Sequence, residues 1–121
     1  MDDSGAMRDL QELRERIGTF VAERDWDQFH SPKNLAMALS VEASELLELF
    51  QWLSEAESAA PDEKLRARAA EEMADVLWFL VRIADRLDVD LLAAAEAKLA
   101  RNAEKYPAER VRGQSRKYDE Y

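Results

Sequence analysis

The chain has 121 residues, and 47% of them are hydrophobic, which is the size and apolar content of one folded domain. Its net charge of −9 disfavours a nucleic acid polymer as a partner, because like charges repel. The sequence has no cysteine, no uncharged apolar run of about 18 residues and no leader-like start, so we expect no disulfide, no membrane partner and a cytoplasmic location.

Apolar residues that recur every three or four positions predict four helices. In chain order the predicted helices cover about residues 7–23, 32–55, 61–87 and 90–106. Ser31 and Pro32 predict the cap and first position of the second helix, Pro61 the start of the third, and Asp88 or Asp90 the cap of the fourth. Residues 54–63 are expected to form a short loop, and the tail from Pro107 is expected to be extended or irregular.

Strand-like alternation of apolar and polar residues is missing from the sequence, so the predicted fold class is all-α, with four helices. We expect a single domain over residues 1–121, in which residues 1–6 and 113–121 are flexible ends.

Two of the predicted helices carry a pair of acids on an apolar face. Glu42 stands where the apolar stripe of the second helix lacks a member, and Glu45 lies at the edge of the same face. The third helix repeats the pattern with Glu72 and Asp75. One such pair would be ordinary on a solvated helix face, but two pairs in core positions indicate a site.

These two pairs are predicted to meet. If the helices fold back antiparallel about the loop between them, Glu42 lies level with Asp75 and Glu45 with Glu72. Burial and like charges both raise a carboxyl pKa, so four such groups need a compensating cation. Oxygen ligands suit Mg²⁺, with Mn²⁺ as a substitute, and Mg²⁺ also takes phosphate oxygens. A di-iron site is disfavoured because the one histidine, His30, lies in a predicted loop.

Aromatic residues follow both acid pairs. Trp52 comes seven positions after Glu45, and Phe79 comes seven after Glu72, so each is predicted to share a helical stripe with an acid. Trp52 is a candidate for stacking on a nucleobase, whereas core packing is an equal alternative for Phe79. Trp26, just before the second helix, fits a hydrophobic staple better than a pocket wall on spacing alone.

The fourth predicted helix carries a polar row. Lys98, Asn102 and Lys105 recur at helical spacing, which suits either contacts to phosphate or a solvated face. They begin a basic segment, since residues 98–117 hold seven Lys or Arg against two acids. A small anion that is also bound to a metal would fit both the acidic helices and this segment.

Several stretches closely resemble the all-α nucleoside triphosphate pyrophosphohydrolases, in the dCTP pyrophosphatase branch of the MazG-like group. They are AERDWDQFHSPKNLAMALSVEASELLELFQW, EEMADVLWFLV, NAEKYP and SRKY, and the resemblance covers about residues 8–118. An ExxE motif followed by ExxD is the metal signature of this family. The fold it implies is the four-helix MazG-like fold, assembled as a helical bundle between subunits in a homotetramer, a dimer of dimers.

The resemblance implies Mg²⁺-dependent hydrolysis of a nucleoside triphosphate between its α and β phosphates. It implies that the metal ligands are Glu42, Glu45, Glu72 and Asp75, and that Glu45 also activates the attacking water. Trp26 and Trp52 would line the base pocket. The remaining predicted substrate contacts are His30, Phe79, Lys98, Asn102, Lys105, Tyr106, Arg116, Lys117 and Tyr118.

The base is the open question. Relatives often have tyrosine where this chain has Phe79, and histidine near Ile17. We expect dCTP or a modified dCTP as the substrate, with dUTP or a broader range of dNTPs as the alternative. A helical module that binds nucleotides or proteins without catalysis is the alternative from another class.

Overall fold

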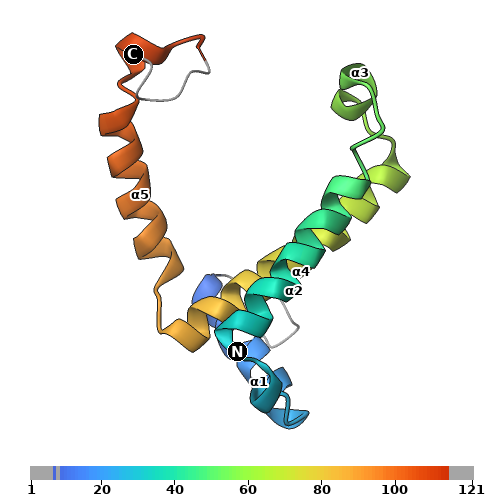
Figure 1. Cartoon of the computed structure of the whole chain (residues 1–121), viewed down its shortest axis with the longest axis vertical. Coiled ribbons are helices and arrows are strands. Elements are labelled where there is room, and N and C mark those ends of the chain that lie inside the picture. The colour runs from blue at the N-terminus through green and yellow to red at the C-terminus, as the bar shows by residue number, and fades with distance from the viewer. Residues whose placement is uncertain (1–6, 8, 115–121) are drawn as a thin grey trace. The chain divides into compact units, whose positions relative to one another are not determined.

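The structure is a computed structural model that describes residue 7 and residues 9–114 (Figure 1). Its helices are α1 Leu10–Glu23, the 3₁₀ turn η1 Asp27–Phe29, α2 Pro32–Glu48, α3 Glu55–Ala59, α4 Glu63–Leu87, α5 Leu91–Lys105 and α6 Ala108–Val111. No strand occurs in these described ranges, so the all-α prediction is confirmed.

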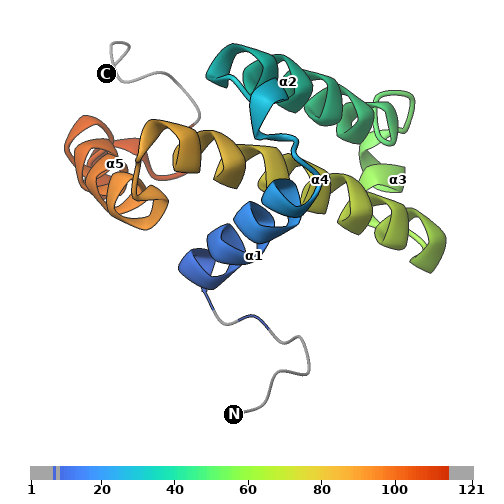
Figure 2. The ribbon, with the colours of Figure 1, turned by 90° about the horizontal axis from the view of Figure 1, so that it is seen from below.

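The chain divides into two compact units, the first ending at Asp88 and the second beginning at Val89. In the first unit α2 and α4 lie side by side as an antiparallel hairpin, and α1 packs against α4 (Figures 1 and 2). The buried apolar side chains are Ile17 and Val21 of α1, Leu35 of α2, and Ala69, Val81 and Ala84 of α4. This small core fixes the faces that α2 and α4 turn toward each other.

In the second unit, α5 and α6 follow each other, and neither contains a buried residue. Leu92 and Leu99 of α5 are 55% and 71% exposed. Within its own unit, the apolar side of α5 is therefore largely exposed. That both units form one domain stays a prediction.

Short polar side chains begin most of these helices. The caps Asp9, Ser31, Ser54, Asp62 and Asp90 each accept a hydrogen bond from the backbone N–H three residues on. The predicted cap at Ser31 with Pro32 behind it is therefore confirmed. Asp88 and Asp90 were both predicted as possible N-caps of the last long helix. Asp90 is the cap of α5, whereas Asp88 ends α4 in the left-handed conformation with φ 55°.

The predicted helix bounds were wrong at four places. α1 begins at Leu10 because Asp9 caps it, and α2 ends at Glu48, seven residues early. Pro61 lies before the cap Asp62 and not inside α4. α3 occupies the predicted loop, where Ser54 and Glu57 form a reciprocal capping box.

The tail prediction was also incomplete. Residues 108–111 form the short helix α6, and the described chain ends three residues later at Gln114. Over the described residues, no helix combines the length and the apolar character that crossing a membrane requires.

Candidate active site

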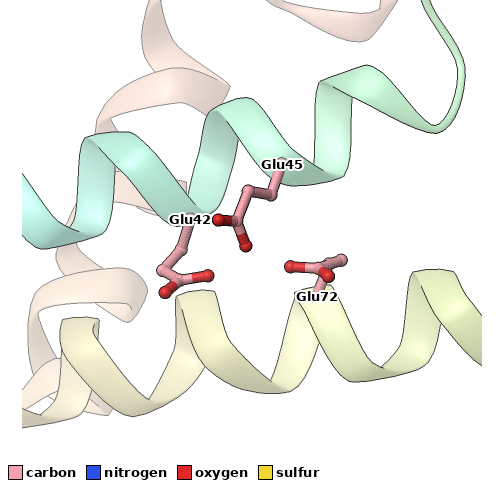
Figure 3. A group of neighbouring side chains, drawn as sticks. All are labelled: Glu42, Glu45 and Glu72. Carbon is pink, nitrogen blue, oxygen red and sulfur yellow. The ribbon is translucent and has the colours of Figure 1, made fainter.

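Three glutamates meet between the two helices of the hairpin. Glu42 and Glu45 come from α2 and Glu72 from α4, and one carboxylate oxygen of each lies within 4.8 Å of the others. Figure 3 shows the three side chains reaching into the space between α2 and α4. The i, i+3 spacing places both α2 residues on the face turned to α4, and the antiparallel path of α4 brings Glu72 to the same level.

This acidic cluster contains unsatisfied buried atoms. Glu42 Oε2 and Glu72 Oε2 are buried and have no hydrogen-bond partner among the described residues. Leaving a buried polar atom unpaired costs about 1–3 kcal/mol, and more when it is charged. The fold therefore holds two buried carboxylate oxygens that a cation or a proton would satisfy.

The raised pKa values of the cluster also indicate that it needs a compensating positive charge. Burial, hydrogen bonding to Glu45 and the charges of Glu45, Asp75 and Glu72 raise the pKa of Glu42 to about 7. Burial, Glu45, Asp75 and Glu71 likewise raise the pKa of Glu72. Without a cation the cluster keeps protons at a pH where ordinary carboxyls have lost them.

A hard divalent cation fits this donor set. All three ligand groups are carboxylates, and Mg²⁺ and Mn²⁺ favour oxygen ligands, whereas structural zinc sites favour Cys and His. The two orphaned oxygens of Glu42 and Glu72 are the atoms that such an ion would satisfy.

Asp75 does not belong to this group of three. It is exposed, but its charge acts on both Glu42 and Glu72. The predicted level match thus brings three acids together with the fourth beside them, and ligation by all four stays a prediction.

An aromatic cluster lies on the same hairpin and the segment before it. Trp78 of α4 makes edge-to-face contacts with Phe20, His30 and Phe79, at ring-centroid distances of 6.4, 5.9 and 5.0 Å. Trp26 contacts Phe20 at 5.7 Å and lies 6.5 Å from His30. Trp26, His30 and Phe79 are therefore parts of one cluster.

Sequence reasoning missed Phe20 and Trp78, the residues that join this aromatic cluster. Trp78 stands directly before Phe79 in the stretch LWFLV, so its aromatic ring could have suggested a site residue. An apolar residue on a helix is equally expected in the core, and the sequence pattern does not distinguish the two. His30 accepts a hydrogen bond from Arg82, which lies 52 residues away, and no spacing rule would have paired them.

Trp52 does not share a helical stripe with Glu45, because α2 ends at Glu48 and Trp52 lies in the turns that follow. Its side chain is 87% exposed, more than any other large hydrophobic side chain described. An indole left in water is available to stack on a ligand or on another subunit.

The predicted phosphate contacts lie in the second unit. Lys98, Asn102 and Lys105 belong to α5, and Tyr106 ends it, with its backbone N–H donating to the Asn102 carbonyl at 2.8 Å. Their approach to the acidic cluster stays a prediction. The remaining predicted contacts fall outside the described residues, namely Arg116, Lys117 and Tyr118.

Comparison with known proteins gives consistent relatives. Residues 37–121 match the model of the MazG-like family, across the boundary between the two units. Human dCTP pyrophosphatase 1 is 47% identical over 113 residues, which cover 92% of this chain and 66% of that protein. The rat dCTP pyrophosphatase 1 is 47% identical over 111 residues, or 90% of this chain and 65% of that one.

A solved structure supports the fold. The crystal structure of a pyrophosphatase from Archaeoglobus fulgidus superimposes with a TM-score of 0.78 and 36% identity, covering 84% of this chain and 95% of that one. The chain spans about two thirds of the length of the curated relatives, and nearly the whole of the archaeal protein. With its family match, these relatives and its acidic hairpin, the chain belongs to the MazG-like family, in the branch that includes the dCTP pyrophosphatases.

Proposed function

We propose that this chain is a Mg²⁺-dependent nucleoside triphosphate pyrophosphohydrolase. Its substrate is dCTP or a modified dCTP, and its products are the nucleoside monophosphate and pyrophosphate, a reaction that removes unwanted nucleotides from the pool. The observation that carries the proposal is the cluster of Glu42, Glu45 and Glu72 with two buried, unpaired oxygens. Curated relatives named dCTP pyrophosphatase 1 supply the substrate class.

The acids divide the work at the site. Glu42, Glu45, Glu72 and Asp75 would hold the cation, which would satisfy the buried oxygens of Glu42 and Glu72. When bound, a divalent cation neutralises charge that builds up on the phosphates during cleavage. Glu45 lies next to both Glu42 and Glu72 in the cluster. Its carboxylate also accepts the proton of the attacking water.

The remaining contacts bind the two ends of the nucleotide. Trp26 and the exposed Trp52 line the base pocket, with His30 beside Trp26 and Phe79 beside Trp78 in the aromatic cluster. The row on α5 binds the phosphates and sugar through Lys98, Asn102, Lys105 and Tyr106. Arg116, Lys117 and Tyr118, which lie outside the described residues, are further proposed contacts to the phosphates.

The protein acts as a homotetramer, a dimer of dimers. Large apolar side chains are exposed on both helices of the hairpin and on α5, namely Met37, Val41, Leu47, Met73, Leu77, Leu80, Leu92 and Leu99. Other copies of the chain would cover these surfaces, as in bundles shared between subunits.

A panel of dNTPs tests the proposed reaction. Purified protein is incubated with each dNTP, including 5-substituted dCTP, with Mg²⁺ or with EDTA, and pyrophosphate is measured. We expect Mg²⁺-dependent release, with the highest kcat/KM for dCTP or its modified form. Best turnover of dUTP, or equal turnover of all bases, would replace the substrate assignment, and no pyrophosphate from any nucleotide would refute the activity.

Thermal unfolding tests the metal site apart from turnover. A ligand that binds only the folded state stabilises it by about 2.7 kcal/mol at 100 times its Kd. We expect Mg²⁺ to raise the unfolding midpoint of the wild type and to have no such effect on Glu42→Gln or Glu72→Gln. If Mg²⁺ leaves the unfolding midpoint of all three proteins unchanged, the result would favour a helical module without a metal site.

A further inference from the structure

Arg82 of α4 is a buried cation that the proposed reaction does not use. It is 3% exposed and is the only charged residue that is buried among those the structure describes. Burying a guanidinium is costly unless partners compensate the charge and take up its N–H groups. In this protein such partners are present on three sides of the guanidinium.

Two of the partners are carboxylates. Arg82 Nη2 pairs with Asp27 Oδ1 at the start of η1, 55 residues away, and Nη1 donates to Asp85 Oδ2 at 2.9 Å. The other oxygen of Asp85 accepts from Arg14 Nε of α1 at 2.7 Å. One guanidinium therefore ties η1 to α4 directly, and to α1 through Asp85.

The third partner is the imidazole of His30. Arg82 Nε donates to His30 Nδ1 at 3.1 Å, so Nδ1 is an acceptor and the ring proton lies on Nε2. Burial and the charges of Arg82 and Arg86 lower the pKa of His30, against the raising effect of Asp27. The ring is thus neutral at neutral pH, with Nε2–H as a hydrogen-bond donor of fixed orientation.

These bonds hold both ends of η1. Trp26 immediately precedes Asp27, and His30 immediately follows Phe29, the last residue of η1. The rings of Trp26 and His30 lie 6.5 Å apart, and His30 also contacts Trp78. Without Arg82, the short segment would keep few anchors to α4, since Arg86 approaches Asp27 only to 3.7 Å.

We propose that Arg82 is a positioning residue for the nucleobase. It touches no substrate and acts through η1, where it holds the face of Trp26 and the Nε2–H donor of His30 in one arrangement. A donor held in this way selects a base edge that presents an acceptor, such as O2 or N3 of cytosine. The inference rests on the proposed function, because it takes the segment from Trp26 to His30 as a wall of the base pocket.

The wild-type protein allows a direct test of the histidine. It has one histidine, so long-range ¹H–¹⁵N NMR spectra report His30 without assignment. At neutral pH we expect the neutral ring with the proton on Nε2. A protonated Nδ1, or a mixture of both neutral forms, would overturn the inference, and this result does not depend on whether the chain hydrolyses a nucleotide.

Substitution tests the effect on the base. Arg82→Met removes all three contacts, Arg82→Lys keeps the charge without the guanidinium geometry, and Arg66→Met is the matched control at an exposed position of α4. Affinities for dCTP and dATP are measured by calorimetry with Ca²⁺ in place of Mg²⁺ to prevent turnover. We expect Arg82→Met and Arg82→Lys to bind dCTP about tenfold or more weakly, with a clearly smaller loss for dATP and with Arg66→Met like the wild type.

The outcomes separate this inference from the proposed function. If Arg82→Met does not fold, Arg82→Lys and the wild-type spectra decide. An equal loss of affinity for both nucleotides, or no loss, would show a structural arginine and overturn the inference while leaving the hydrolase intact. A wild type that binds dCTP but never releases pyrophosphate would refute the hydrolase, yet the selective loss in both Arg82 variants would still stand.

Discussion

Glu42 is the residue at which the needs of folding and function conflict. An uncharged side chain of its size would avoid the cost of a charge on the buried Oε2, but a cation needs the carboxylate. Glu42→Gln keeps the shape and mimics the protonated form. We expect it to lower Mg²⁺-dependent turnover by about 100-fold or more, since losing even an outer-shell partner costs about 10- to 100-fold.

The same variant should not unfold the protein. Its unfolding midpoint in EDTA at pH 8 is expected to equal or exceed that of the wild type, because a buried negative charge has been removed. Glu48→Gln, an exposed position on the same helix, is the control and should keep full activity. Full turnover in Glu42→Gln would remove Glu42 from the metal set.

The raised pKa of Glu42 predicts how stability changes with pH. An unfolded glutamate titrates near pH 4.3, whereas Glu42 in the folded state titrates at about 7. Between these values the folded state binds more protons than the unfolded state. Stability without metal should therefore fall as the pH rises through about 7.

His30 acts in the opposite direction, because its lowered pKa makes stability rise with pH below the pKa of an unfolded histidine. The comparison that isolates Glu42 is the wild type against Glu42→Gln in EDTA, by thermal unfolding from pH 5 to pH 8. We expect the difference in midpoint to move in favour of the variant as the pH rises. A difference that is constant over this range would contradict the raised pKa.

At the scale of elements, the sequence predicted what local chemistry determines. Periodicity located the four long helices, and Ser31 with Pro32 marked the start of α2. No glycine or proline marks the end of α2 at Glu48, so the apolar periodicity extended the predicted helix beyond it. The capping box of α3 was legible as Ser54 and Glu57, but the segment was interpreted as a loop.

In the candidate site too, contacts that follow from local spacing were predictable, and contacts that depend on long-range packing were not. The acidic hairpin was predictable because helical periodicity and a short connection bring Glu42, Glu45 and Glu72 together. The partners of Arg82 were not, since Asp27 and His30 lie 55 and 52 residues away in the sequence. Contacts between segments so far apart depend on how helices pack, and spacing along one helix does not report them.

The capping box of α3 carries a prediction of its own. α3 has five residues and none of them is buried, so its stability depends on the bonds between Ser54 and Glu57. Ser54→Ala should cost α3 about 1 kcal/mol. We expect faster amide hydrogen exchange confined to residues 55–59, with Mg²⁺-dependent turnover kept. Ser58→Ala in the same helix is the control. Equal exchange rates in both variants would show that the capping box does not stabilise α3.

At the scale of the whole molecule, exposed apolar surface predicts assembly. Leu92 and Leu99 lie seven residues apart on one side of α5 and are more than half exposed. Light scattering of the wild type should give four times the mass of one chain. Leu99→Glu should reduce that mass, because it places a charge in the surface that we propose another copy covers.

The control for this variant is Ala97→Glu, which adds the same charge to the opposite side of α5. It should leave the mass of the assembly unchanged, and circular dichroism should show equal helix content in both variants. If the site needs neighbouring copies to complete it, Leu99→Glu also loses turnover, and its activity recovers with rising protein concentration because association obeys mass action. A wild type that stays a single chain at all concentrations would contradict the assembly, and α5 would then have to cover its apolar side in some other way.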